Sequence, residues 1–265
     1  MLIVDVGLHH GQDTAYYLSR GAAVVAIDAD LRLIQQARDT FADAVTAQRL
    51  HLIHAAVASS SGTIAFHLSD NSEWNSLSSD IAGRKDLGMT TIEVEAVTLP
   101  DVFRAHGTPD YCKIDVEGAD LLCLESLKGY APLPHLISVE SECGGEEGVT
   151  ETAALRTLDA LHGLGYERFK LVDQATLAVL GPNTRFYTSV WRRVMRKLRP
   201  PRDVLQRRLG WRFERGASGP FGDDLDGDWV TYRVAVSLLR AHRADYFSQP
   251  SASPFGFWCD WHAKR

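Results

Sequence analysis

The chain has 265 residues, 45% of them hydrophobic, and a formal net charge of −6. This length can bury a substantial core, and the acidic balance argues against a general nucleic-acid-binding protein. Its four cysteines (Cys112, Cys123, Cys143 and Cys259) form no C-x-x-C pair, so buried reduced thiols are favoured over a zinc site or a disulfide framework. No apolar run approaches the roughly 20 residues that span a bilayer, and no basic segment precedes the first apolar stretch. We therefore expect a cytoplasmic protein.

Strands and helices alternate through the first 180 residues. An apolar strand at 2–6 leads through Gly7 to a helix at 12–20, and the strand "AAVVAIDAD" precedes a helix over 31–45 that Asp30 can cap. Further strands are predicted at "LHLIHAAVA", "GTIAFHL", "TIEVEAVTL", "DYCKIDVEG", "HLISVESE", "RFKLVD" and "LAVLG", with helices at 119–128 and 151–164. This alternation indicates an α/β fold, a doubly wound and mostly parallel sheet covered on both faces.

The glycine-containing loop after the first strand is the first candidate ligand site, because ligands bind at the carboxyl ends of parallel strands. Asp28 ends the next strand, where a carboxylate can accept both hydroxyls of a ribose. Three residues separate Gly7 from Gly11, whereas a pyrophosphate-binding loop has the pattern G-x-G-x-x-G. Asp5 just before the loop suits a cationic ligand, such as S-adenosylmethionine, better than a diphosphate. The alternative is an ordinary glycine turn.

Two later strands end in paired acids, Asp115 with Glu117 and Glu140 with Glu142. A spacing of two puts each pair on one face if the strand persists that far, so four acids could meet at one rim. Such acids either raise one another's pKa and supply a base, or gather around a cation such as Lys113 or a divalent metal. We predict no metal, because no tight ligand spacing is present. The alternatives are an acidic pair at the start of the next helix and solvated acids at a strand end.

Four segments together resemble a known family: "VDVGLHHGQDT", "VVAIDAD", "HAAVA" and, most specifically, "CKIDVEGADLLCLESL". They are similar to the FkbM family of S-adenosylmethionine-dependent methyltransferases, from residue 2 to about residue 173. The tail, with "SGPFGDDLDGDW" and "WCDWHA", is similar to that of a bacterial subset of the family. The resemblance implies a Rossmann-like class I methyltransferase fold and O-methylation of sugar hydroxyls in glycans, glycolipids or natural products. S-adenosylhomocysteine would be the product of the cofactor.

The resemblance also assigns candidate residues. It matches Asp5, Gly7 and Gly11 to the first cofactor loop, Asp28 to the acid on the ribose, and residues 55–57 to the segment near the adenine. The candidate cofactor-binding residues are Asp5, Gly7, His9, Gly11, Thr14, Asp28, Ala56 and Asp115. The candidate catalytic residues are Asp115, Glu117, Glu142 and His262, the last if the tail folds back over the cleft.

Leu8 and His9 depart from the Ala-Asn that is frequent in the family, and Asp28 replaces a more frequent Glu. The loop at Trp74, Asn75 and Ser76 either reaches cofactor or acceptor or is a plain connection.

The composition changes after Gly181. Between Arg185 and Arg215 there are eleven Lys or Arg residues and two acids, in a chain that is acidic overall. We expect a single domain over residues 1–265, with a core over about 1–181 and a helical, basic C-terminal elaboration over about 182–265. An amphipathic helix ended by Pro200 and Pro201 could lie on a membrane, cover an acceptor or pack on its own domain. A final helix is predicted within 230–247.

These observations favour an S-adenosylmethionine-dependent O-methyltransferase that acts on a carbohydrate or glycolipid acceptor, in the cytoplasm or at the inner face of a membrane. A nicotinamide-dependent oxidoreductase is the enzymatic alternative, and the missing third glycine disfavours it. A noncatalytic, membrane-associated protein that keeps a nucleoside-binding fold is the alternative from another class. We expect no nucleic-acid partner.

Overall fold

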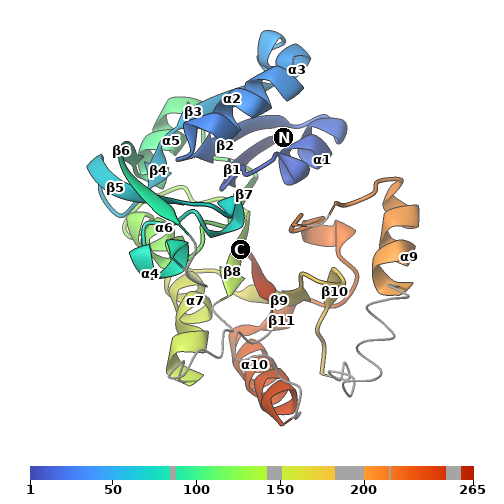
Figure 1. Ribbon diagram of the computed structural model, residues 1–265. Helices are drawn as coiled ribbons and strands as arrows, with labels where there is room; N and C mark the ends of the chain where they lie inside the picture. Colours follow the sequence, from blue (N-terminus) through green and yellow to red (C-terminus); the bar gives the residue numbers. More distant parts are fainter. Residues whose placement is uncertain (84–87, 142–150, 183–199, 215, 249–257) are drawn as a thin grey trace. The chain divides into compact units, whose positions relative to one another are not determined.

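The computed structural model describes residues 1–83, 88–141, 151–182, 200–214, 216–248 and 258–265 (Figure 1). They form two compact units, Met1–Ile137 and Ser138–Arg265. The division falls after Ile137, whereas the sequence places the end of the core near residue 181. The single-domain organisation stays a prediction.

The first unit begins with the predicted alternation of strands and helices. Its elements are β1 (Leu2–Val6), α1 (Gln12–Ser19), β2 (Ala23–Asp28), α2 (Leu31–Thr40), α3 (Ala42–Thr46), β3 (Leu50–His54), β4 (Ala56–Val57), β5 (Gly62–Ser69), a 3-10 turn η1 (Ser72–Trp74), α4 (Ser79–Ala82), β6 (Met89–Val97), α5 (Leu99–His106), β7 (Tyr111–Ile114) and α6 (Asp120–Ser126). The principal sheet has the strand order β7-β1-β2-β3, and every pairing in it is parallel. The parallel α/β architecture is confirmed.

The order of these strands creates a switch point beside β1. The chain leaves β1 toward β2 and β3 and later returns to place β7 on the other side of β1. Because such crossovers are right-handed, the two directions put their helices on opposite faces of the sheet. The loops after β1 and β7 are therefore neighbours at the carboxyl edge, where ligands bind in this class of sheet.

The interiors of β1 and β2 are apolar and buried, with Ile3, Val4, Val24 and Val25 all at 0% exposure. This burial explains why these strands are apolar runs without polar alternation. Helix α2 begins as predicted, since the Asp30 side chain accepts a hydrogen bond from the Arg32 amide. The helix predicted over 31–45 is wrong in one respect, because it divides into α2 and α3 at Phe41.

A second sheet of three strands, in the order β4-β6-β5, completes the first unit. Strand β4 pairs with β6 in parallel, and β5 pairs with β6 antiparallel. Ala29, Ala56, Phe66 and Val94 form the buried cluster that packs against partly buried side chains of this sheet. The strand predicted as "TIEVEAVTL" ends earlier than expected, at Val97, because Thr98 and Asp101 form a capping box that starts α5.

The second unit has a sheet in which β9 pairs antiparallel with three other strands. It holds most of β8 (Leu136–Ser141), then α7 (Glu151–Gly163), β9 (Arg168–Asp173), β10 (Ala178–Val179), α9 (Pro200–Leu209), a 3-10 turn η3 (Gly222–Asp224), β11 (Val230–Thr231), α10 (Tyr232–Phe247) and β12 (Cys259–Lys264). The strand order is β10-β9-β12-β8, and β11 also pairs with β9. Strand β12 runs antiparallel to β9. Because it lies between β9 and β8, it is an inner strand of this sheet.

The C-terminal third differs from a purely helical elaboration. Its described part contains the predicted final helix, α10, but also strands β11 and β12. Pro200 and Pro201 open helix α9, which the sequence reading missed; proline is accepted in a first helical turn because its missing amide proton would have no partner there. The amphipathic segment before Pro200 lies outside the described residues. Within the described ranges, no helix is both long and apolar enough to span a bilayer.

Candidate functional site

The loop between β1 and α1 takes backbone conformations that favour glycine. Gly7 has φ 85° and Gly11 has φ 78°, and the amides of Gly7 and Leu8 both donate to the carbonyl oxygen of Ile27 at 3.0 and 3.1 Å. A Cβ atom on Gly7 would lie inside van der Waals contact of the backbone oxygen of Asp115. Gly7 is therefore needed where the β1 loop and the β7 loop meet.

Asp28, at the end of β2, is held from two sides by backbone amides. His9 N donates to Oδ2 at 2.8 Å, and Asp30 N donates to Oδ1 at 2.9 Å. Burial raises the pKa of Asp28 from 3.8 to about 6. The two amide hydrogen bonds lower this pKa, but their effect is smaller than that of burial. Each carboxylate oxygen keeps a lone pair beyond its amide contact. The carboxylate is thus fixed in place and able to accept two neighbouring hydroxyls.

Lys113, on β7, is buried among three carboxylates. Its Nζ lies 3.3 Å from Asp5 Oδ1, 3.6 Å from Asp13 Oδ2 and 3.6 Å from Asp115 Oδ2, and it donates to the Gly7 carbonyl at 3.1 Å. Burial alone would lower the pKa of Lys113, but Asp5, Asp115 and Asp13 together raise it well above 10.5. One cation against three anions leaves a net negative charge beneath the loop, which favours a cationic ligand over a phosphate.

The predicted strand through Asp115 and Glu117 is wrong in its extent. Strand β7 ends at Ile114; the chain then turns, with Gly118 at φ 79° and the Asp120 carboxylate accepting from the Val116 amide at 3.2 Å. The two acids therefore do not share a strand face. The Asp115 side chain is 24% exposed and directed toward Lys113, and Glu117 is half-buried.

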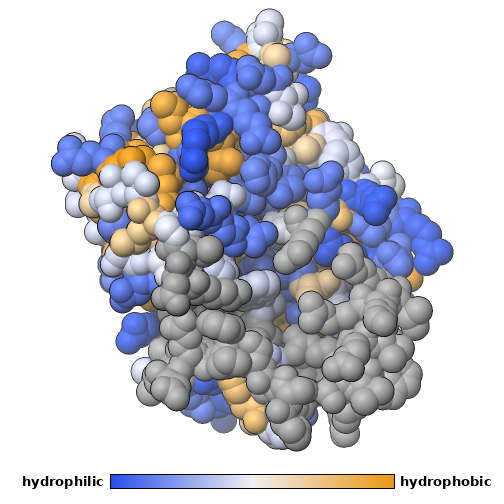
Figure 2. All heavy atoms as spheres, in the orientation of Figure 1, coloured by the Kyte–Doolittle hydropathy of each residue, from blue (hydrophilic) through white to orange (hydrophobic). Residues whose placement is uncertain are grey.

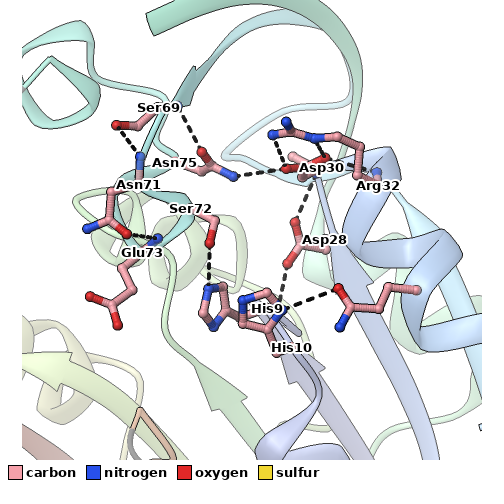
Figure 3. Close-up of polar contacts among 12 residues, drawn as sticks. His9, His10, Asp28, Asp30, Arg32, Ser69, Asn71, Ser72, Glu73 and Asn75 are labelled. Carbon is pink, nitrogen blue, oxygen red and sulfur yellow. Dashed lines mark hydrogen bonds and ion pairs between the residues drawn. The ribbon is translucent and has the colours of Figure 1, made fainter. Parts of the chain in front are cut away.

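A polar segment that follows β5 is hydrogen-bonded to the loops after β1, β2 and β7, and Figure 3 shows the contacts with the first two of these loops. Ser72 Oγ lies 3.0 Å from His9 Nε2, Asn75 Nδ2 donates to Asp30 Oδ2 at 3.2 Å, and Ser76 Oγ donates to the Glu117 carbonyl at 2.6 Å. We call residues 71–76 the clasp segment. It is hydrogen-bonded to the loops that follow three strands, and whether it also reaches cofactor or acceptor stays open.

His9 is the loop residue whose side chain reaches the clasp segment. Its φ of 49° is unusual for a residue other than glycine, and its ring lies 4.1 Å from the ring of His10, centroid to centroid. Burial, followed by the neighbouring His10, lowers the pKa of His9. A neutral imidazole is therefore favoured, and its link to Ser72 orients it.

Four of the other predicted cofactor residues lie inside the fold. Asp5 is 0% exposed, and Thr14, also at 0%, donates to Asp5 Oδ2 at 2.6 Å. Their side chains are therefore buried beneath the loop, and the role of Asp5 and Thr14 in cofactor binding stays a prediction. Ala56 is 5% exposed and belongs to the apolar cluster of the second sheet. Gly11 packs against the Phe41 ring, where a Cβ atom would clash.

The remaining predicted acid–base residues belong to the second unit. Glu140 is half-buried in β8, and Glu142 lies outside the described residues. His262 is 2% exposed in β12, opposite Lys170 of β9. Burial, followed by the charge of Lys170, lowers the pKa of His262 to about 3. The structure therefore buries His262 as a neutral side chain.

Sequence reasoning missed Asp13 and left open which cation compensates the acids. Asp13 is 4% exposed in the first turn of α1 and faces Lys113. The signal for Lys113 was present, since it is a charged residue inside the apolar strand "YCKI". Nothing in the spacing marked Asp13, because an acid in a first helical turn is common on exposed surfaces as well. Across the described ranges, no group of three His, Cys, Asp or Glu side chains is arranged to hold a metal ion.

Taken together, a parallel sheet with a switch point, a glycine loop after β1 and an amide-fixed acid at the end of β2 are the features of α/β proteins that bind a nucleoside. The model of the "Methyltransferase FkbM domain" family matches residues 5–168, which is more than half of the chain. The chain belongs to this family of methyltransferases, as the sequence motifs indicated.

Solved structures with a similar course of the chain include several methyltransferases. One is a SAM-dependent methyltransferase from Geobacter sulfurreducens in complex with S-adenosyl-L-homocysteine, with 13% identity, a TM-score of 0.39, and coverage of 100% of this chain and 84% of that one. Another, from Thiobacillus denitrificans and also in complex with S-adenosyl-L-homocysteine, has 14% identity, a TM-score of 0.38, and coverage of 100% and 85%. Likeness at this level adds nothing to the family assignment. No curated protein matches the chain in sequence.

Proposed function

We propose that this protein is an S-adenosylmethionine-dependent O-methyltransferase whose acceptor is a sugar hydroxyl. The observation that carries the proposal is the Asp28 carboxylate, fixed by the amides of His9 and Asp30 at the end of β2. Two hydroxyls on neighbouring ribose carbons fit the remaining lone pairs of such a carboxylate. Asp28 would thus hold the ribose of the cofactor, at the carboxyl edge where the loops after β1 and β2 meet.

The charge beneath the loop supports this cofactor over a dinucleotide. Lys113 is outnumbered by Asp5, Asp13 and Asp115, so the region is negative. The amino group and sulfonium of S-adenosylmethionine are positive, whereas a dinucleotide would bring two phosphate charges. Gly7 and Gly11 also lack the third glycine of a pyrophosphate-binding loop.

Bound S-adenosylmethionine supplies an electrophilic methyl group, and the protein must bring a hydroxyl oxygen into line with it and accept the hydroxyl proton. Glu117 is the candidate base, since it is half-buried and its backbone carbonyl is held by Ser76. Asp115 is the candidate electrostatic partner of the cofactor, because it is the most exposed acid around Lys113. The acceptor class rests on the family resemblance, and a glycan or glycolipid is the expected carrier of the sugar.

Calorimetric titration with S-adenosylmethionine, S-adenosylhomocysteine and NAD tests the cofactor, with Asp28→Ala as the variant and Asp39→Ala, an exposed acid on α2, as the matched control. We expect both adenosyl ligands to bind to the native protein and to the control, and to lose at least about tenfold in affinity in Asp28→Ala. Binding of NAD alone would replace the proposal with an oxidoreductase.

Transfer of a labelled methyl group to a panel of sugars tests the O-methylation. We expect this transfer in the native protein and expect it to be abolished in Glu117→Gln.

A further inference from the structure

The arginines around helix α9 divide into two pairs with different surroundings. Arg202 is 6% exposed and donates to the carbonyl oxygens of Phe213 and Glu214 at 2.8 and 2.7 Å. Arg208 donates to the Asp224 carbonyl and lies 3.4 Å from Asp226 Oδ1. These two arginines tie α9 to the segments that follow it.

The other two, Arg207 and Arg212, are exposed and line a groove. The groove has a volume of about 620 Å³, and the remaining lining residues are Asp203, Gln206, Gly210 and Trp211. Arg207 Nε donates to the backbone oxygen of Asp203 at 3.2 Å. Within the described residues neither guanidinium group forms an ion pair. The surface over α9 is mainly hydrophilic (Figure 2).

The backbone that carries these side chains is held by hydrogen bonds at the end of α9. Gly210, at φ 66°, ends α9 and turns the chain back along the last helical turn. The Gln206 carbonyl accepts from the Trp211 amide at 3.2 Å, and the Gln206 side chain accepts from the Phe213 amide at 2.8 Å. Trp211 is half-buried. The groove is shallow and largely open to solvent, so a ligand would contact it from one side.

We propose that this groove binds an anionic sugar, with its phosphate or carboxylate between Arg207 and Arg212 and its ring against Trp211. Guanidinium groups bind both oxyanions in a bidentate manner. The electron-rich face of an indole ring attracts the polarised C–H groups of a sugar's apolar face. Asp203, whose Oδ1 accepts from Gln206 Nε2 at 3.4 Å, keeps carboxylate lone pairs for ring hydroxyls. If the protein has the proposed function, the ligand of this groove is its methyl acceptor. The acceptor would then be an acidic or phosphorylated saccharide.

The test is direct binding, measured by calorimetry on the full chain without cofactor. The probes are glucosyl phosphate, glucuronate, neutral glucose and inorganic phosphate. We expect the two anionic sugars to bind more tightly than glucose or phosphate alone, and Arg207→Gln/Arg212→Gln to weaken them by about tenfold or more. Trp211→Leu should weaken both as well. Arg38→Gln/Arg233→Gln makes the same charge change on exposed positions of α2 and α10 and should leave binding unchanged.

Several outcomes would overturn the inference. One is that glucosyl phosphate binds to the Arg207→Gln/Arg212→Gln protein as tightly as to the native protein. Another is that glucose, or inorganic phosphate alone, binds to the native protein as tightly as glucosyl phosphate does. Cosedimentation with phosphatidylglycerol vesicles that glucosyl phosphate does not displace would assign the arginines to a membrane surface instead. Circular dichroism of the same variants checks that they fold, and S-adenosylhomocysteine binding to the native protein separates the two proposals. Its absence in the native protein would remove the methyltransferase proposal and leave the groove standing.

Discussion

The ammonium group of Lys113 lies 3.3 Å from Oδ1 of Asp5, and both side chains are almost fully buried, at 5% and 1% exposure. Asp13 and Asp115 complete the surroundings of the same ammonium group. A buried cation with three anionic neighbours is costly to disrupt, because removing it leaves the anions close together without compensation.

Lys113→Met should therefore destabilise the first unit severely. The free energy of unfolding should fall by about 3–5 kcal/mol, since the uncompensated carboxylates must take up protons or admit water. Urea unfolding followed by circular dichroism measures it. Lys128→Met is the control, because Lys128 is 69% exposed and lies 3.8 Å from Glu125; its loss should cost less than about 1 kcal/mol. Equal costs for the two variants would contradict the role given to Lys113.

Asp28 predicts how cofactor affinity depends on pH. Its pKa of about 6 means that the carboxylate of the free protein becomes protonated as the pH falls through that value. Ribose hydroxyls donate best to the ionised form, so binding lowers the pKa, and affinity is lost as the pH falls below it. Titration with S-adenosylhomocysteine from about pH 5 to about pH 8 should show affinity rising through about pH 6 and then levelling. Asp28→Asn should bind weakly without this rise, and a native profile that is flat below about pH 7 would refute the assignment.

Much of the first unit followed from local sequence patterns. Strand β1, the capped start of α2 and the acid at the end of β2 were all predicted, because apolar runs and capping residues act locally. Helix α5 was missed, since "VTLPDVF" continues an apolar strand and the Thr98–Asp101 capping box was not recognised. The extent of β7 was wrong for a related reason: the turn at Gly118 depends on its packing beside Ile81, which is distant in sequence.

The candidate site was predicted as a set of residues but not as a geometry. Acids around Lys113 were expected, yet which of them face it depends on the strand order, which sequence spacing does not encode. The link from His9 to Ser72 spans 63 positions and leaves no local pattern. For His262, a tail near an acceptor was envisaged, whereas the register of β12 against β9 buries the side chain.

Gly7 and Gly21 form a matched pair for testing the close approach of two loops. Both have positive φ, 85° and 80°, but a Cβ atom at Gly7 would clash with the Asp115 backbone, and at Gly21 it would meet nothing within 4 Å. Gly21→Ala should cost about 1 kcal/mol from backbone strain alone. Gly7→Ala should cost clearly more and should also weaken S-adenosylhomocysteine binding. Thermal unfolding and calorimetry measure both effects, and equal losses would show that the close approach does not matter.

Ser76→Ala tests the clasp segment. Ser76 is 2% exposed; its hydroxyl donates to the Glu117 carbonyl at 2.6 Å and accepts from the Ser78 amide at 3.0 Å. Its removal should cost about 1–3 kcal/mol, because both backbone groups lose a partner. Amide exchange of Ser78, measured by NMR, should accelerate. Ser237→Ala, which removes an exposed hydroxyl bonded to the Arg233 carbonyl, should change neither quantity. Unchanged exchange at Ser78 would show that the segment is held by other contacts.

His262 predicts acid sensitivity of the second unit. Burial and Lys170 hold its folded pKa at about 3, below the ordinary 6.5. The unfolded chain therefore binds a proton that the folded chain does not, so stability is complete above about pH 6.5 and falls as the pH drops toward the folded value. The slope should be about 1.4 kcal/mol per pH unit in that window. Urea unfolding at several pH values should show this slope in the native protein and in His135→Gln, an exposed control. It should be smaller in His262→Gln, where His242 of the same unit, whose pKa is also lowered by burial, keeps its contribution. A native slope that persists in His262→Gln would assign the acid sensitivity to other groups.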